Sequence, residues 1–182
     1  MKAIMISIQP KYVADILNGK KTLEIRKTMP KCDYPIDVYI YCTKDTSYQF
    51  HKNYVKCNGK VVAKFTLNKV EEQKQDFYKG NDKDFYKHCC LQPKELFDYI
   101  GHKKWYAWHI DNLEIFDSPR ELSEFYGNFT QKRYERIFGN NTIELDKKYG
   151  GLRQPTKSGY EYVYPLTKAP QSWCYIEVEE DE

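Results

Sequence analysis

Short runs of strand-forming residues recur along this sequence with few helical patterns between them, which limits the folds open to the chain. The runs are rich in Val, Ile, Tyr, Phe and Trp, residue types that favour β-strands. They span residues 2–9, 20–26, 38–42, 61–67, 105–115 and 172–178. About six strands with so few helices predict an α+β protein, a small mixed β-barrel with a few flanking helices.

The first run leads into a short helix. Both alternating faces of residues 2–9 are largely apolar, so we expect this strand to be buried. Pro10 suits the first helical position, where the missing N–H has no intrahelical partner to lose. Gly19 suits the C-terminal cap. Between them lie three apolar residues at helical spacing: Val13, Ile16 and Leu17.

The chain of 182 residues predicts one domain, residues 1–182, with two insertions and no internal repeat. The first insertion, near 71–104, is polar, with helical spacing close to residues 93–99. The second, near 127–169, leads us to expect a loop over residues 139–170, because glycine and proline recur there. An acidic tail, residues 177–182, follows the last strand.

One further helix start is predicted between the insertions. Ser118 would be the cap, Pro119 would lie in the first turn, and Glu121 follows three residues after the serine.

The composition excludes two classes of protein. Aromatic residues make up 16% of the chain, whereas disordered chains are poor in them. The mean hydropathy is −0.81, and no apolar run approaches the ~20 residues that cross a bilayer. Without a secretory signal in the first residues, we expect a cytoplasmic protein with reduced thiols and no membrane partner. The oligomeric state is left open.

Cysteine and histidine spacing argues against a metal centre. No two of the six cysteines form a C-x-x-C pair, and Cys89 and Cys90 are adjacent, which does not suit a closed structural site. Cys42 and Cys174 lie in predicted strands and are expected in the core. The alternative is a metal site built from irregularly spaced ligands: His51, Cys57, His88, Cys89, Cys90 and His102. We expect no metal and no cofactor.

The charge distribution favours an anionic partner. The formal net charge is +3, and the remainder carries +8 once the five carboxylates of residues 177–182 are set aside. A basic surface of that size suits a polyanion such as a nucleic acid. The alternative is a protein-binding face formed by the acidic tail and the tyrosine-rich loops.

Residues 19–26, GKKTLEIR, concentrate charge on one short strand. Leu23 and Ile25 share one face, whereas Glu24 and Arg26 share the other with Thr22. Such charge is awkward in a core and useful in a cleft. The alternative is an ion pair at a solvated edge, which would contribute only ~0–1 kcal/mol to stability.

This segment resembles the G-x-K-x-x-E-x-R signature of the ASCH domain, a branch of the PUA-like β-barrels. The preceding residues 7–19 resemble the opening strand and helix of that family. Further blocks match in the same order: 38–41, 59–65, 108–110 and 170–173. The resemblance covers residues 3–70, 105–126 and 170–178, whereas 71–104 and 127–169 match no known pattern.

The resemblance implies a barrel whose cleft, lined by the signature strand, binds RNA, another nucleic acid or a modified nucleoside. Lys20, Lys21 and Arg26 would neutralise phosphates. Arg26 could instead contact a base edge, and Glu24 could accept from the exocyclic amine of cytosine. Four residues complete the expected contacts, the aromatic ones by stacking on unpaired bases: Tyr39, Tyr41, Trp173 and Ser172. A core role is the alternative for each aromatic residue.

An enzyme is the second interpretation. Some small members of the family are amidohydrolases that remove the acyl group from acetylcytidine, with a lysine matching Lys21 and a threonine at the position of Glu24. Because Glu24 replaces that threonine, their mechanism does not transfer directly. Thr22 is one substitute nucleophile, and Glu24 as general base beside Lys21 is another. Turnover of acylated cytidine-type nucleosides or of RNA therefore stays open. His109 is expected to be structural, with a catalytic role as the alternative.

Overall fold

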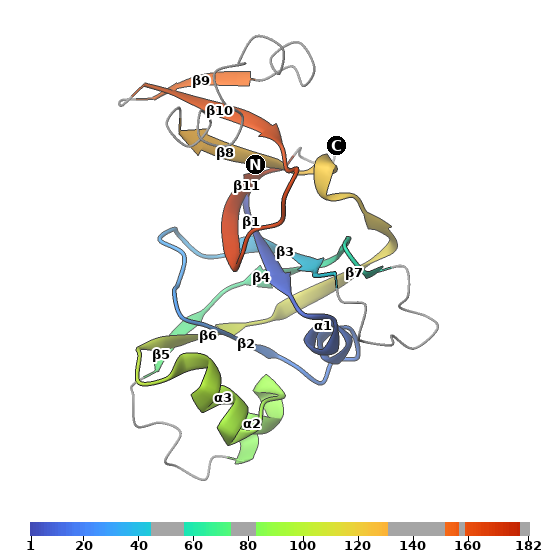
Figure 1. The fold of residues 1–182 in the computed structure, drawn as a ribbon, viewed down its shortest axis with the longest axis vertical. Helices are drawn as coiled ribbons and strands as arrows, with labels where there is room; N and C mark the ends of the chain where they lie inside the picture. The colour runs from blue at the N-terminus through green and yellow to red at the C-terminus, as the bar shows by residue number, and fades with distance from the viewer. Residues whose placement is uncertain (45–56, 74–82, 131–151, 157–158, 179–182) are drawn as a thin grey trace.

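The computed structural model describes residues 1–44, 57–73, 83–130, 152–156 and 159–178. These residues form an α+β fold with most of the chain in strands (Figure 1). The helices are α1 (Pro10–Leu17), α2 (Lys83–Cys89), α3 (Pro93–Ile100) and a 3-10 turn, η3 (Leu122–Glu124). The strands are β1 (Lys2–Ile8), β2 (Leu23–Arg26), β3 (Ile36–Cys42), β4 (Val61–Leu67), β5 (Val70–Gln73), β6 (Trp105–His109), β7 (Asp111–Arg120), β8 (Tyr126–Thr130), β9 (Leu152–Thr156), β10 (Gly159–Pro165) and β11 (Trp173–Glu177).

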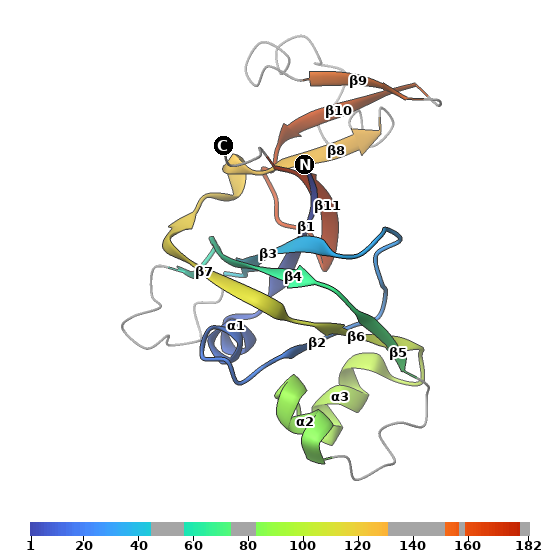
Figure 2. The ribbon, with the colours of Figure 1, turned by 180° about the vertical axis from the view of Figure 1, so that it is seen from behind.

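The strands form two sheets. The larger has eight strands in the order β7-β4-β3-β1-β11-β8-β10-β9, and the smaller has the order β2-β6-β5. Within the larger sheet β1 and β3 are parallel, and its other neighbouring pairs are antiparallel. Figure 1 and the reverse view in Figure 2 place β8, β9 and β10 at one end of the molecule and α2 and α3 at the other.

The predicted α+β class is confirmed, but the described strands do not close into a barrel of about six. At two places the chain instead passes from one sheet to the other. At one place it leaves β4 at Asn68 and continues as β5, and at the other it leaves β6 at Ile110 and continues as β7. The pairing of β4 with β7 contains two register shifts, and such irregularities bend strands and increase their twist. Sequence periodicity reports which residues form strands but not where a strand changes sheet.

The loop expected over residues 139–170 is wrong for two segments, because Leu152–Thr156 and Gly159–Pro165 pair as β9 and β10. The predicted helix start at Ser118 is also wrong. Residues 118–120 end strand β7, and Glu121 caps η3, the short turn that follows. A proline is tolerated there because β7 is an edge strand of the sheet. The helices predicted after Pro10 and near residues 93–99 are confirmed as α1 and α3.

Strand β1 lies at the centre of the molecule, as its two apolar faces predict. Ile4, Ile6 and Ile8 pack into one buried cluster beneath α1, with residues of β3 and β4. Ala3 and Met5 pack into a second cluster on the other face of the sheet. A third cluster joins α2 and α3 to the small sheet and includes Trp105 and Ile25. The signature strand β2 is therefore held between the helices and β6.

Candidate functional site

A tight turn after α1 carries the chain into the signature strand. Gly19 has φ +68°, a left-handed conformation that glycine adopts without steric cost. The backbone N–H groups of Lys20 and Lys21 then both donate to the Asp15 carbonyl. Strand β2 follows at Leu23 and pairs with β6, so that Glu24 lies opposite Trp108.

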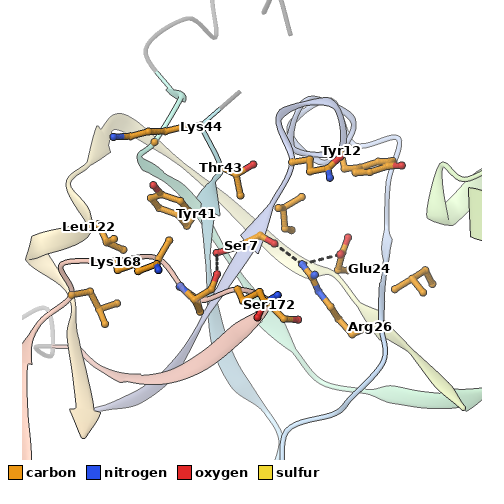
Figure 3. A pocket seen from close by; sticks show the side chains of 18 of the residues that line it. Ser7, Tyr12, Glu24, Arg26, Tyr41, Thr43, Lys44, Leu122, Lys168 and Ser172 are labelled. Atoms are coloured by element: carbon orange, nitrogen blue, oxygen red, sulfur yellow. Dashed lines mark hydrogen bonds and ion pairs between the residues drawn. The ribbon is translucent and has the colours of Figure 1, made fainter. Parts of the chain in front are cut away.

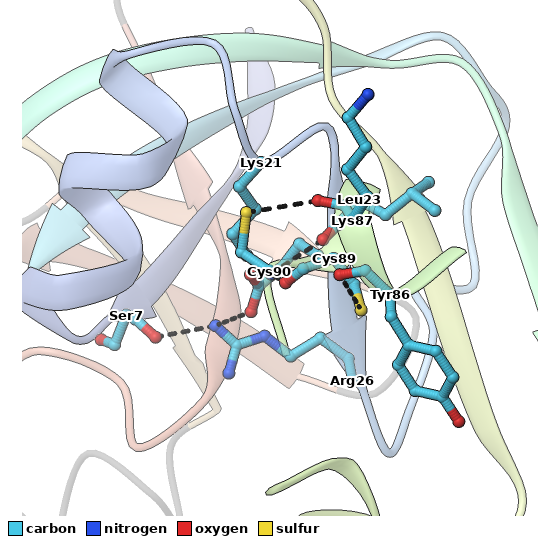
Figure 4. Close-up of polar contacts among 9 residues, drawn as sticks. Ser7, Lys21, Leu23, Arg26, Tyr86, Lys87, Cys89 and Cys90 are labelled. Atoms are coloured by element: carbon cyan, nitrogen blue, oxygen red, sulfur yellow. Dashed lines mark hydrogen bonds and ion pairs between the residues drawn. The ribbon is translucent and has the colours of Figure 1, made fainter. Parts of the chain in front are cut away.

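Lys21 is buried, with 2% of its surface exposed. Its ammonium donates to the Leu23 carbonyl at 2.8 Å and to the Cys89 carbonyl at 2.6 Å, and it lies 3.3 Å from Glu24 Oε2 (Figure 4). An ammonium has three donors, and these contacts account for all of them. Lys21 therefore ties β2 to the end of α2 and orients the Glu24 carboxylate.

Arg26 engages the other oxygen of the same carboxylate. Its Nη2 lies 3.1 Å from Glu24 Oε1 and donates to the Ser7 carbonyl at 2.8 Å. Glu24 and Arg26 are 6% and 8% exposed. Arg26 Nε is buried and has no hydrogen-bond partner among the described residues. Lys21, Glu24 and Arg26 thus form one buried chain of alternating charge, which we call the ion chain.

Ser7 links the ion chain to the segment before β11. Its N–H donates to the Ser172 carbonyl at 2.9 Å, and its hydroxyl donates to the Pro170 carbonyl at 2.6 Å. At the other end of this segment, Leu166 N–H donates to the Phe125 carbonyl at 2.7 Å. Residues 165–172, which we call the 165–172 loop, are therefore held to the fold at both ends.

The ion chain lies on the wall of a cavity of about 1120 Å³ (Figure 3). All eight residues of the 165–172 loop line this cavity, and so do residues at the ends of β1 and β3. Its charged lining comprises four cations and three carboxylates: Lys21, Arg26, Lys44 and Lys168, and Glu24, Glu95 and Glu121. Because Glu95 pairs with Lys11 and Glu121 with Lys60 outside this set, the excess positive charge lies with Lys44 and Lys168.

Helix α3 forms part of the cavity wall. Its residues Glu95 and Tyr99 line the cavity together with Leu91, which precedes the helix. Tyr12 on α1 also lines the cavity, and burial raises the pKa of its hydroxyl. The ion pair of Lys11 with Glu95, at 3.1 Å, joins α1 to α3. Residues 91–99 are therefore part of the site.

The structure places four predicted residues elsewhere. Lys20 is exposed beyond the turn, and Thr22 Oγ1 lies 2.8 Å from His88 Nδ1. Tyr39 is buried against Phe125, with ring centroids 5.1 Å apart. None of them is among the described residues that line the cavity, and neither is the fourth, Trp173. Trp173 Nε1 instead donates to Thr28 Oγ1 at 2.9 Å.

Five predicted residues do come together around the cavity. They are Lys21, Glu24, Arg26, Tyr41 and Ser172. Tyr41 is 7% exposed, so most of its ring packs in the core and only an edge faces the cavity. The sequence reasoning missed Lys44, Lys168 and the α3 residues. Lys44 lies within residues 3–70, where the family resemblance was found, and Lys168 lies two positions before the matched block 170–173, so sequence position was a signal for both.

The remaining candidates among the described residues lie outside the cavity lining. His109 Nε2 lies 3.1 Å from Glu71 Oε1, outside the cavity lining. Burial raises the pKa of Cys42 to about 12, with the neighbouring Cys57 adding to the effect. All six cysteines are free thiols. Among the described residues, no group of three or more His, Cys, Asp or Glu side chains could hold a metal ion, and His51 lies outside those residues.

In the described part of the chain the longest helices have eight residues, and none has the length and apolar content of a membrane span.

Comparisons with known proteins agree with this fold. The family model of the ASCH domain matches residues 6–147. A solved serine-to-alanine variant of the ASCH protein from Zymomonas mobilis shares the fold with a TM-score of 0.56, at 16% identity over 96% of this chain and 88% of that chain. The unsubstituted protein from that organism gives a TM-score of 0.49, at 17% identity over 96% and 87%. No curated protein matches the chain.

The family match extends over the ion chain, the cavity-lining residues Tyr41 and Thr43, and helices α2 and α3. Because it spans well over half of the 182 residues, the chain belongs to the ASCH domain family, whose members are PUA-like modules generally associated with RNA binding.

Proposed function

We propose that this protein binds RNA by taking an unpaired nucleotide into the cavity, with the base at the ion chain. The observation that carries the proposal is the position of Lys21, Glu24 and Arg26, buried side by side on the wall of a cavity of about 1120 Å³. Ligand pockets commonly measure about 300–1,000 Å³. The cavity therefore has room for a nucleotide and part of its neighbour.

Burial of the ion chain supports a functional role for it. Removing charges from water costs several kcal/mol per ion, and a buried ion pair is often no more stabilising than apolar residues of the same volume. The ion chain is 2–8% exposed and borders a cavity rather than a packed core. Stability alone therefore explains the burial of these charges poorly, whereas the binding of a ligand to them explains it well.

Each member of the ion chain has a different role in the proposal. Lys21 has its donors engaged within the protein, so it positions Glu24 rather than contacting RNA. Glu24 is the acceptor for an exocyclic amine, as on cytosine, and Arg26 donates to a neighbouring acceptor of the base. Tyr41 supplies an aromatic edge at the cavity floor. Lys20, Tyr39, Trp173 and Thr22 lie outside the cavity and have no part in this arrangement.

Hydrolysis is a second candidate, favoured by the carboxylate of Glu24 at the cavity wall. With Glu24 as general base and a neighbouring cation to stabilise the developing anion, an acylated cytidine or an RNA strand would be the substrate. Thr22 is not used as a nucleophile in this version, because its hydroxyl contacts His88 outside the cavity. Product formation that persists in Glu24→Gln protein would contradict this candidate.

Binding is tested by fluorescence anisotropy with two labelled ten-nucleotide RNAs, oligo(C) and oligo(U). Oligo(C) should bind more tightly, because cytosine carries an amine where uracil carries a carbonyl oxygen. Glu24→Gln should remove this preference, whereas Glu114→Gln, an exposed carboxylate paired with Lys64, should retain it. Equal affinity of wild-type protein for both RNAs would contradict the role of Glu24.

A cavity-blocking variant tests the site without altering the ion chain. Thr43 lines the cavity at the end of β3 and is half-buried, so Thr43→Trp should fill the space and abolish binding while the protein stays folded. The unchanged affinity of a folded Thr43→Trp protein would place RNA elsewhere on the surface.

A further inference from the structure

The two ends of the cavity differ in how their charges are paired. At the inner end, Lys21 and Arg26 both bond to Glu24. At the outer end, Lys44 and Lys168 line the cavity, and neither has an anionic partner among the described residues. Figure 3 shows both lysines on the side of Tyr41 and Leu122, across the cavity from Glu24 and Arg26. A ligand that spans the cavity would therefore meet a polar inner end and a cationic outer end.

A glycine in the turn before β4 leaves room for the Lys44 side chain. Its side chain lies over Gly59, where an added Cβ would be 2.7 Å from Lys44 Cε. Gly59 has φ +81°, and its N–H donates to the Cys42 carbonyl at the end of β3. The turn before β4 thus presents a bare backbone along which the lysine stem extends to the cavity. Any larger residue at Gly59 would displace that stem.

The backbone of Lys168 is held by hydrogen bonds on both sides. It lies in the middle of the 165–172 loop, between the hydrogen bond at Leu166 and the two bonds from Ser7. Two prolines in this loop, Pro165 and Pro170, further restrict its backbone. The Lys168 side chain is exposed at the cavity, so its ammonium is available while its backbone is held.

We propose that Lys44 and Lys168 form a phosphate subsite, so that the ligand of the cavity is a nucleotide bound by both base and phosphate rather than a free nucleoside. The inference rests on the proposed function, since it takes the base to lie at the ion chain. Lysine is a point-charge phosphate ligand that tolerates varied geometry. The hydroxyl groups of Thr43 and Thr167, which also line the cavity, add donors beside the two lysines.

The charge contribution is tested by the salt dependence of oligo(C) binding. Each phosphate contact to a single strand contributes about 0.7 to the slope of log affinity against log salt concentration. Lys44→Gln and Lys168→Gln should each reduce the slope by about 0.7 and weaken binding several-fold at low salt. Lys103→Gln removes the same charge from an exposed position outside the cavity and should leave slope and affinity unchanged.

The positioning of Lys44 is tested without removing its charge. Gly59→Ala should displace the lysine stem and weaken binding in the same direction as Lys44→Gln. Gly101→Ala is the matched control, because Gly101 also has a positive φ, +61°, but no atom within 4 Å of the added methyl group. A folded Gly59→Ala protein that binds as wild type does would contradict the position assigned to Lys44.

The source of the phosphate is tested by competition against labelled oligo(C). Cytidine 5′-monophosphate should compete better than cytidine, and Lys44→Gln/Lys168→Gln protein should lose that advantage. Inorganic phosphate that competes as well as the nucleotide would overturn the assignment to a nucleotide. If Glu24→Gln weakens RNA binding while both lysine variants bind normally, the phosphate subsite is wrong and the proposed function stands. If wild-type protein binds neither RNA nor the nucleotide, both proposals are wrong.

Discussion

The ammonium of Lys21 lies 2.6 Å from the carbonyl oxygen of Cys89, 68 positions along the chain. This bond joins the segment that leads into β2 to the last residue of α2, a helix within the residues that the family model matches. The carbonyl groups at a helix C-terminus lack intrahelical partners and carry partial negative charge. Helix α2 therefore completes the surroundings of Lys21.

Replacing Lys21 should destabilise the protein strongly. Lys21→Met leaves Glu24 with Arg26 as its remaining cation and leaves the Cys89 carbonyl without its donor. Breaking a buried pair by removing one partner costs about 3–5 kcal/mol. Urea unfolding of Lys21→Met and Lys20→Met measures this difference, since Lys20 is exposed and its loss should change the free energy of unfolding by less than about 0.5 kcal/mol. Equal stabilities of the two variants would show that the buried contacts of Lys21 contribute nothing net.

Gly19→Ala should cost about 1–2 kcal/mol of unfolding free energy, the penalty for an L-residue in the left-handed region. The cost is conformational alone, because no atom lies within 4 Å of the added methyl group. Gly19→Asn should cost less, since asparagine tolerates this conformation better. Thermal unfolding of both variants gives the order. If the alanine variant were more stable than the asparagine variant, the φ angle of Gly19 would not be what determines the effect on protein stability.

Ser7→Ala should loosen the 165–172 loop. The change removes the hydroxyl that donates to the Pro170 carbonyl but keeps the backbone bond to the Ser172 carbonyl. A typical hydrogen bond contributes about 0.5–1.5 kcal/mol. Hydrogen exchange should therefore become faster at the amides of Thr167, Lys168 and Ala169, whereas β4 should exchange as in the wild type. Unchanged exchange in the loop would show that the backbone bonds alone hold it.

Cys42 should make the protein less stable in alkali. Burial raises the pKa of this thiol to about 12 in the folded state, from an ordinary value of 9.0. The unfolded thiol therefore loses its proton first, so stability is complete below pH 9 and falls as pH rises from 9 toward 12. Urea unfolding at pH 8 and pH 10 should show a smaller decrease for Cys42→Ala than for the wild type. An equal decrease would assign the pH dependence to other groups.

Local sequence patterns predicted the elements around the site well where one short segment decides its own conformation. Pro10 and the apolar stripe after it predicted α1, and the two apolar faces of residues 2–8 predicted the central strand. The charge density of residues 19–26 indicated Lys21, Glu24 and Arg26. The helix and strand predictions are confirmed because helix capping and strand alternation depend on neighbours within a few residues.

Local patterns do not determine features that long-range pairing decides. Residues 160–164 are rich in strand-forming tyrosine and valine, but the glycines and prolines around them favoured a loop, and residues 152–156 and 159–165 form β9 and β10 by pairing with each other. Trp173 and Tyr39 have the chemistry of stacking residues, but their partners Trp108 and Phe125 hold them outside the cavity lining. Whether an aromatic side chain faces the cavity depends on how it packs rather than on its residue type.

By itself, the sequence determined the α+β class, the resemblance to the ASCH family and the clustering of Lys21, Glu24 and Arg26 in one short segment, since each depends on residue order over short distances. Only the tertiary structure decided that two sheets form without closing, that α3 and the 165–172 loop enclose the cavity, and that Lys21 faces inward to Cys89. These features depend on contacts between residues far apart in the chain. The register and direction of such contacts follow from packing the whole core, which no single segment specifies.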